Sequence, residues 1–287
     1  MGAAQTEAAS APASLYPAGP GGLAAAVAEG YAECRVGASR WRIAHLLGSA
    51  ELRRRYARSR LGQFWVTLST LVSVVALGSV WTVLWQQPVD EMLPYIAVSL
   101  VIWAFISSFV ADGMSIFIAN AHYMLNQGLP VSVFVYGFVW RNFLIFAHNA
   151  VIVLLTTLIF GTLTFSGAAE FLLALVLTLI TGFFTAFIVA MACLRYRDLI
   201  QVVSSVMQIA FYLTPVLWRP EFMKVDFAPA LIAFNPFAIF LSIMRDPLLG
   251  RAVEAETWIA AASITAAVAA ASLALIGLWR RRIIYWV

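Results

Sequence analysis

Charged side chains are scarce in this sequence. Only 11% of the residues are Asp, Glu, Lys or Arg and 62% are hydrophobic, whereas soluble domains carry roughly 25% charged residues. Of the 18 basic residues, Lys224 is the one lysine. Because Met223 precedes it, the sequence contains no G-x-x-x-x-G-K-[ST] phosphate loop. The chain is therefore expected to lie mostly in lipid and cannot hydrolyse ATP by the mechanism that this loop supports.

Acidic residues are also missing from the middle of the long apolar runs. Asp112, Glu170 and Asp198 lie at the ends of such runs, whereas proton- or sodium-coupled carriers place ionisable groups within the membrane. The three histidines show no zinc-ligand spacing with Cys34 and Cys193, and two cysteines indicate no disulfide framework. The sequence therefore disfavours secondary transport and predicts no catalytic residue, no metal and no cofactor in this chain.

A basic cluster followed directly by an apolar run is the most informative feature present. Five arginines lie within residues 53–60, and an uncharged run follows at 64–85. About 20 apolar residues in a helix cross the hydrocarbon core of a bilayer. A basic flank of this kind stays on the cytoplasmic side. Membrane anchoring also explains the pI of about 9.3 without a nucleic acid as partner.

The apolar runs predict an all-α integral membrane protein with six spans. These spans are approximately 64–85, 94–111, 131–160, 171–194, 199–218 and 258–279. A further apolar stretch, 227–244, is interrupted by Pro229 and by Asn235-Pro236, so its pieces are too short to cross. We expect it to form a broken helical hairpin on the external face, between the fifth and sixth spans.

The distribution of basic residues sets the predicted orientation. With six spans, the cytoplasmic segments hold 8 basic residues before the first span, 2 between the fourth and fifth, and 3 after the last. The external segments hold 4, and Arg141 lies inside the third apolar region. Both termini are therefore predicted to be cytoplasmic. A seventh span would place residues 280–282 outside.

The N-terminal part differs in composition from the rest. Residues 1–30 are rich in Ala, Pro and Gly and lack the basic start of a signal peptide, so they are expected to form a disordered cytoplasmic tail. Residues 31–287 are expected to form a single transmembrane domain. Apolar and basic residues alternate over 38–58, which suits an amphipathic helix lying in the membrane interface. An ordinary solvated helix is the alternative.

Several short motifs resemble those of ABC-type polysaccharide-export permeases, the bacterial family of O-antigen, teichoic-acid and capsule exporters. They are YARSRLGQFW at 56–65, RYRDL at 195–199, TPVLW at 214–218, NPF at 235–237 and RDPLLG at 245–250. The resemblance implies a type-2 ABC exporter fold in the bacterial inner membrane. It also implies a homodimer that binds two copies of a separate ATPase subunit, which holds ATP and Mg, and exports a glycan carried on a polyprenyl diphosphate lipid.

Two other functions remain open at this point. A related permease that exports a drug or a simple lipid would share the fold. A membrane-embedded enzyme or scaffold without a transport role is the second alternative.

The resemblance also implies sites at both ends of the molecule. By this resemblance, segment 118–130 would be the coupling helix that contacts the ATPase subunit. Gly128 and Pro130 would end such a helix. A plain connecting loop is the alternative. Its docking face would hold His122, Tyr123 and Asn126. A second cytoplasmic loop would hold Arg195, Arg197 and Asp198. The external gate would include Pro215, Asn235, Pro236 and Arg245.

Two further groups of residues suit contact with a lipid-linked glycan. Guanidinium groups bind phosphate oxygens bidentately, and residues four apart share a helix face, so the diphosphate headgroup would meet Arg54, Arg58, Ser59 and Arg60. Simple positive-inside anchoring is the alternative for this cluster. Aromatic side chains that could stack on sugar rings are Trp103, Tyr136 and Trp140. Packing or interfacial anchoring is the alternative for these.

Overall fold

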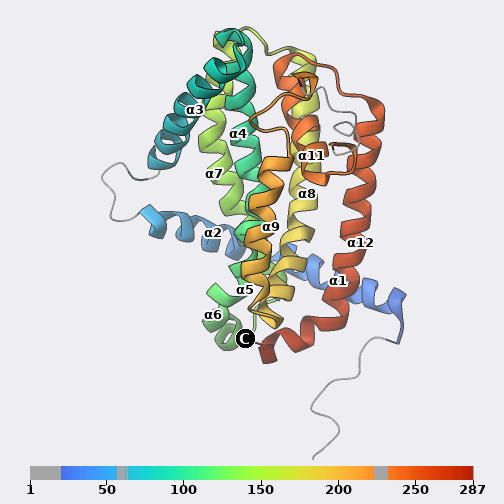
Figure 1. Ribbon diagram of the computed structural model, residues 1–287. Helices are drawn as coiled ribbons and strands as arrows, with labels where there is room; N and C mark the ends of the chain where they lie inside the picture. The colour runs from blue at the N-terminus through green and yellow to red at the C-terminus, as the bar shows by residue number, and fades with distance from the viewer. Residues whose placement is uncertain (1–20, 57–61, 63, 223–231, 287) are drawn as a thin grey trace, which may run out of the picture.

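A computed structural model describes residues 21–56, 62, 64–222 and 232–286 of the chain, and every regular element in these ranges is helical. Five helical segments are long and apolar enough to cross a membrane, and Figure 1 shows them side by side in one bundle. They are α3 (Phe64–Trp85), Val89–Ala119, α7 (Val131–Ile159), α8 (Phe165–Arg195) and α12 (Ala255–Trp286). The second combines α4 (Val89–Ala111), the 3-10 turn η1 (Gly113–Ser115) and α5 (Ile116–Ala119).

The fifth predicted span is shorter than expected. Helix α9 (Leu199–Leu213) has 15 residues, about 22 Å at 1.5 Å per residue, whereas the hydrocarbon core is about 30 Å thick. It ends before residue 218 because Pro215 disfavours a helical backbone at the preceding residue. Thr214 is accordingly extended, with φ −90° and ψ 138°. The chain therefore continues from α9 as a non-helical segment over residues 214–219.

The two ends of the bundle differ in structure. α8 and α12 have 31 and 32 residues, or about 46–48 Å of helix, which exceeds the thickness of the hydrocarbon core. At one end lie the short helix α6 (Ala121–Gln127), the α8–α9 turn and the end of α12 (Figure 1). We call this the α6 end. The other end, the α11 end, holds the α3–α4 and α7–α8 turns and the 3-10 turn η3 (Asp246–Leu249).

Two helices near the N-terminus lie across the bundle rather than along it (Figure 1). They are α1 (Leu23–Ser39) and α2 (Trp41–Tyr56), and together we call them the collar. The sequence predicted one amphipathic helix over 38–58 and a disordered tail that ended at residue 30. The predicted end of the tail is wrong, since Leu23 to Gly30 are helical. The predicted start of the helix at residue 38 is also wrong, since α1 runs to Ser39 and α2 begins at Trp41.

Close helix crossings hold the collar against the bundle. A β-carbon built on Gly277 of α12 would lie 1.9 Å from the carbonyl oxygen of Ala26 in α1, and one built on Gly30 would lie 2.0 Å from that of Leu273. In the same way, a β-carbon on Gly48 of α2 would lie 2.3 Å from the carbonyl oxygen of Gly137 in α7. Small residues allow this backbone approach. The collar therefore docks on α12 and on α7 by direct backbone packing.

Helix α11 (Pro236–Arg245) enters the bundle from the α11 end and packs against α4, α8 and α12. Asn235 caps it, because its side-chain oxygen accepts hydrogen bonds from the backbone N–H groups of Phe237 and Ala238. Pro236 takes the first helical position, where no donor is needed. Part of the predicted hairpin, residues 223–231, lies outside the described residues, so the structure describes the half formed by α11.

The Gly277 crossing gives a testable expectation for stability. We expect Gly277→Ala to destabilise the permease by about 1–3 kcal/mol, because the added methyl group forces α1 away from α12. Thermal unfolding of the purified protein and the rate of tryptic cleavage within α1 measure the effect. Gly78→Ala is the matched control, since its β-carbon would lie 3.7 Å from Leu93, which is ordinary contact. Equal unfolding temperatures for the two variants would contradict the docking.

Candidate functional site

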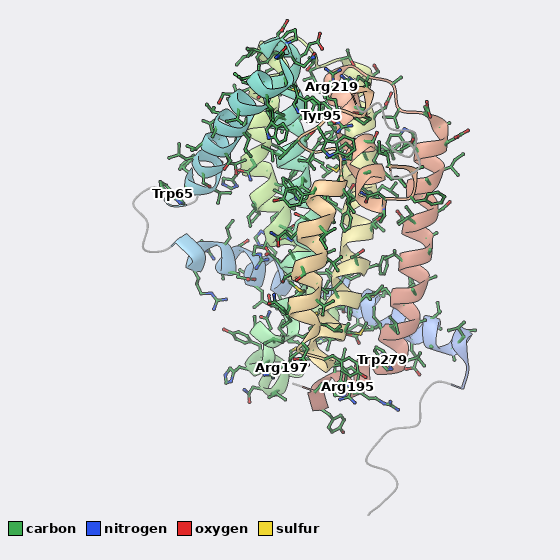
Figure 2. The ribbon with its side chains drawn as sticks, viewed as in Figure 1. Trp65, Tyr95, Arg195, Arg197, Arg219 and Trp279 are labelled. Atoms are coloured by element: carbon green, nitrogen blue, oxygen red, sulfur yellow. The ribbon has the colours of Figure 1, made fainter. Side chains whose placement is uncertain are left out.

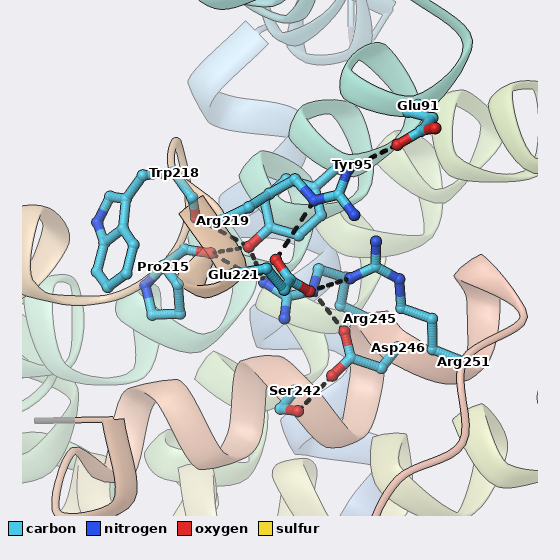
Figure 3. Close-up of polar contacts among 10 residues, drawn as sticks. All are labelled: Glu91, Tyr95, Pro215, Trp218, Arg219, Glu221, Ser242, Arg245, Asp246 and Arg251. Atoms are coloured by element: carbon cyan, nitrogen blue, oxygen red, sulfur yellow. Dashed lines mark hydrogen bonds and ion pairs between the residues drawn. The ribbon is translucent and has the colours of Figure 1, made fainter. Parts of the chain in front are cut away.

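A polar network fills the α11 end of the bundle around one tyrosine (Figure 3). Tyr95 of α4 is 1% exposed, and its hydroxyl shares its proton between the carbonyl oxygens of Pro215, at 2.9 Å, and Trp218, at 3.0 Å. The same hydroxyl accepts a hydrogen bond of 2.8 Å from Nη1 of Arg245. Three segments that are distant in sequence therefore meet at one phenol group. We call this set the Tyr95 network; it comprises Glu91, Tyr95, Pro215, Trp218, Arg219, Glu221, Ser242, Arg245, Asp246 and Arg251.

Three guanidinium groups surround the Tyr95 ring. That of Arg245 lies 4.5 Å from the ring centroid, and those of Arg219 and Arg251 lie 5.8 Å from it. Arg245 is buried, and it also donates hydrogen bonds to Pro215 O and to Asp246 Oδ1, both at 2.8 Å. Cation–π contacts of this kind become stronger when the cation is desolvated.

Carboxylates balance these three positive charges. Arg219 pairs with Glu91 at 2.9 Å, and Arg251 pairs with Glu221 at 3.1 Å, while Asp246 pairs with Arg245 and accepts a hydrogen bond from the Ser242 hydroxyl. A buried charge is tolerated only when it is paired and hydrogen-bonded. The network is therefore built to hold segment 214–222 and η3 against α4.

The residues predicted for the external gate meet beside this network. Pro215 and Arg245 belong to it, and Asn235 Nδ2 donates a hydrogen bond of 3.0 Å to Thr214 Oγ1. Pro236 lines a cavity of about 260 Å³ between α4, α8, α11 and α12. The ring of Trp103 lies nearby, with its centroid 5.6 Å from those of Phe211 and Phe237. Four positions predicted from sequence are thus brought together at the end of α9.

An exposed polar stripe runs along α9. Its members recur at helical spacing and therefore share one face. They are Gln201, Ser204, Ser205, Gln208 and Tyr212, all exposed. The Ser204 and Ser205 hydroxyls donate to carbonyl oxygens four residues back. The side-chain amides of Gln201 and Gln208 take part in no hydrogen bond among the described residues. Exposed Val202, Val206 and Ile209 form a separate apolar face beside the stripe.

The α6 end holds the predicted coupling segment. His122 and Asn126 are exposed, and Asn126 Nδ2 lies 3.1 Å from His122 Nδ1 and donates a hydrogen bond of 2.8 Å to the His122 carbonyl oxygen. Tyr123 is half-buried and packs on the hydrophobic core, so it does not share the exposed polar face predicted for all three. Physically, an i+1 side chain points about 100° away from its neighbour in an α-helix.

The α8–α9 turn lies at the same end. Figure 2 shows Arg195 and Arg197 there, whereas Tyr95 and Arg219 lie at the other end of the bundle. The Arg195 guanidinium lies 5.3 Å from the ring centroid of Tyr196 and 5.4 Å from that of Trp286. It therefore attaches the end of α12 to the turn. Arg197 and Asp198 are exposed. Of the predicted headgroup residues, Arg54 is exposed at the end of α2, whereas Arg58, Ser59 and Arg60 lie outside the described residues.

An ion-pair cluster around one buried arginine joins the collar to the bundle. Arg141 of α7 is 9% exposed, and it pairs with Glu51 of α2 and, at 3.3 Å, with Asp112 at the end of α4. In the sequence, Arg141 is the one basic residue inside an apolar run, and the sequence does not indicate its partners. Such a residue signals a buried pair.

Two of the predicted channel aromatics contact the collar. The Tyr136 hydroxyl donates a hydrogen bond of 3.3 Å to the Cys34 carbonyl oxygen, and Trp140 Nε1 donates one of 3.0 Å to Ser49 Oγ. Both residues therefore contact the collar, and their role in lining a sugar path stays a prediction. Cys34 of the collar is buried. Its burial, together with the adjacent Glu33 carboxylate, raises the pKa of the Cys34 thiol to about 12.

Among residues 21–56, 62, 64–222 and 232–286, no group of three His, Cys, Asp or Glu side chains could hold a metal ion.

Comparison with known proteins identifies the class. The family model for the ABC-2 type transporter matches residues 44–249, and the chain belongs to this family. It is a multi-pass permease without a catalytic domain, and permeases of the family pair with an ATPase subunit. The family-level resemblance predicted from the sequence motifs is thereby confirmed. The match leaves out α1 and the whole of α12.

Two relatives are permeases of O-antigen export systems. The O-antigen export system permease protein RfbA of Klebsiella pneumoniae is 23% identical over 202 residues, which cover 70% of this chain and 78% of the relative. The protein of the same name from Myxococcus xanthus is 24% identical over 193 residues, which cover 67% and 74%.

The Tyr95 network makes a specific prediction. We expect Tyr95→Phe to destabilise the permease by about 1–3 kcal/mol, because it removes the hydroxyl that accepts from Arg245 and leaves the Trp218 carbonyl oxygen without the Tyr95 donor. Thermal unfolding and faster hydrogen exchange of segment 214–222 measure this effect. Tyr212→Phe is the matched control, since the Tyr212 side chain is 66% exposed and makes no hydrogen bond through its hydroxyl among the described residues. Unchanged exchange in Tyr95→Phe would show that the network does not hold this segment.

Proposed function

We propose that this permease is the transmembrane subunit of an ATP-driven exporter that moves a polyprenyl-diphosphate-linked polysaccharide out of the bacterial cytoplasm. It works as a homodimer with two copies of the ATPase subunit, which binds ATP and Mg. The polar stripe on α9 is the observation that carries the choice of cargo. The two relatives named as O-antigen export permeases support the same choice.

The stripe argues for a polar cargo. An unpaired amide in hydrocarbon costs several kcal/mol, so Gln201 and Gln208 would not face lipid tails. They face either water or a second copy of the chain, and both surroundings exist where two permeases enclose a hydrated path. Amide and hydroxyl groups along such a path exchange hydrogen bonds with sugar hydroxyls. A drug or simple-lipid exporter has no use for a polar stripe that continues along a whole helix.

The orientation follows from the basic residues. Arg195, Arg197 and the arginines that follow Trp279 gather at the α6 end (Figure 2), which the positive-inside rule assigns to the cytoplasm. In this orientation both termini are cytoplasmic. The α9 segment completes six crossings together with residues 214–219, and the region from Pro220 through α11 forms the external hairpin. Residues 1–22 then form the cytoplasmic tail, and the remainder forms one permease domain.

The two ends take different tasks in this proposal. At the cytoplasmic end, the exposed His122 and Asn126 of α6 dock the ATPase subunit, with the Arg195–Asp198 turn beside them. Arg54, near the end of the collar, meets the lipid diphosphate together with Arg58, Ser59 and Arg60, which follow in the sequence. At the external end, the Tyr95 network keeps segment 214–222 and α11 closed until the cargo passes. Trp103 would add an aromatic face to the path.

Replacing the stripe glutamines tests the choice of cargo. We expect Gln201→Leu with Gln208→Leu to reduce export of the surface glycan about tenfold or more, because at least two hydrogen bonds of about 1 kcal/mol each are lost along the path. Membrane insertion and copurification with the ATPase subunit should be unchanged. The matched control is Val202→Leu with Ile209→Leu, on the neighbouring apolar face of α9. Full surface glycan in the double glutamine variant would exclude the stripe from the path.

A further inference from the structure

The charged residues of the collar are divided between its two faces. Its acidic side chains turn toward the bundle, where arginines neutralise them. Arg280 Nη2 of α12 lies 3.0 Å from Glu29 Oε2, and its Nη1 lies 3.7 Å from Glu33 Oε2. Glu51 pairs with Arg141 of α7. The described acidic residues of the collar are thus all engaged by the bundle.

The basic residues of the collar have the opposite placement. Those whose side chains the structure describes are Arg35, Arg40, Arg42, Arg53 and Arg54, and all five are exposed. No ion pair among residues 21–56, 62, 64–222 and 232–286 includes any of them. The outward surface of the collar is therefore positively charged without compensation, although its sequence contains both signs.

Large apolar and aromatic side chains share this outward surface. Tyr31 is 62% exposed, and Trp41 and Leu46 are each 60% exposed. The Arg42 guanidinium lies 5.7 Å from the Trp41 ring centroid. Aromatic rings and arginines with apolar stems favour the headgroup level of a membrane. Since α1 and α2 lie across the bundle (Figure 1), the surface runs along the membrane plane.

We propose that the outward surface of the collar binds anionic phospholipid headgroups of the cytoplasmic leaflet. That leaflet carries negative surface potential, which attracts basic segments lying at the membrane surface. Each guanidinium can add charge-assisted hydrogen bonds to a lipid phosphate. Arg280 and Arg141 fasten the collar to α12 and α7. Lipid bound to the collar therefore holds α12 and α7 at a fixed depth in the membrane. The proposal concerns the permease itself and holds whatever cargo it exports.

Lipid preference near the collar can be measured directly. The full-length permease, with Cys34→Ser and Cys193→Ser, receives a single fluorophore through Ala38→Cys, an exposed position, and is placed in nanodiscs. Nitroxide-labelled phosphatidylglycerol or phosphatidylcholine then quenches the fluorophore. We expect phosphatidylglycerol to quench at a lower mole fraction and salt to weaken this preference. The triple variant Arg35→Gln, Arg40→Gln and Arg42→Gln should abolish the preference for phosphatidylglycerol. Each arginine removed should lower the affinity for the anionic lipid about fivefold.

Two further variants separate charge from position. The triple lysine variant at 35, 40 and 42 keeps the charge and should retain the preference. Arg197→Gln removes an exposed arginine outside the collar and should also retain it. Equal quenching by the two lipids in the parent protein would overturn the proposal, as would loss of the preference in the lysine variant. An unchanged lipid preference in the glutamine variant, with weaker ATPase copurification, would assign the surface to a protein partner instead.

Discussion

The absence of water from the hydrocarbon core is the constraint on which this structure depends. Within lipid, backbone groups must pair internally, which leaves helices as the spanning elements here. Side chains obey the same rule: Arg141 is paired with Glu51 and Asp112, and Arg245 is paired with Asp246 and Tyr95. The stripe of Gln201 and Gln208 on α9 departs from it. An exposed polar stripe on a membrane helix therefore indicates where water, or a second copy of the chain, must lie.

Glycine contacts and ion pairs link the membrane surface to the ends of the bundle. Gly277 and Gly48 let the collar approach α12 and α7 at backbone distance, and the Arg141 cluster joins α2 to the end of α4, directly before η1, α5 and α6. A movement of α6 would therefore be transmitted to the collar as well as along α4. At the far end, α4 carries Tyr95, which holds the segment after α9.

The sequence predicts the long helices well because length and apolar composition decide them. Residues 64–85 coincide with α3, and four other apolar runs fall within long helices. Features that depend on tertiary contacts were harder to predict. The Ala-rich residues 23–30 resemble a tail, and their helical packing requires the backbone approach at Gly277. Tyr95 carries no sequence signal, since its partners are backbone carbonyls and an arginine 150 residues away. The lone charge of Arg141 did carry a signal, although its partners could not be read from it.

Transport with defined lipids tests the central claim, that the permease moves a glycan borne on a lipid diphosphate. The permease and its ATPase subunit are reconstituted in proteoliposomes with a fluorescent polyprenyl diphosphate that carries a glycan, or with the same lipid without one. The account predicts ATP-dependent translocation of the glycan-bearing lipid, with stimulated ATP hydrolysis, and little movement of the bare lipid. Equal translocation of both lipids would contradict it.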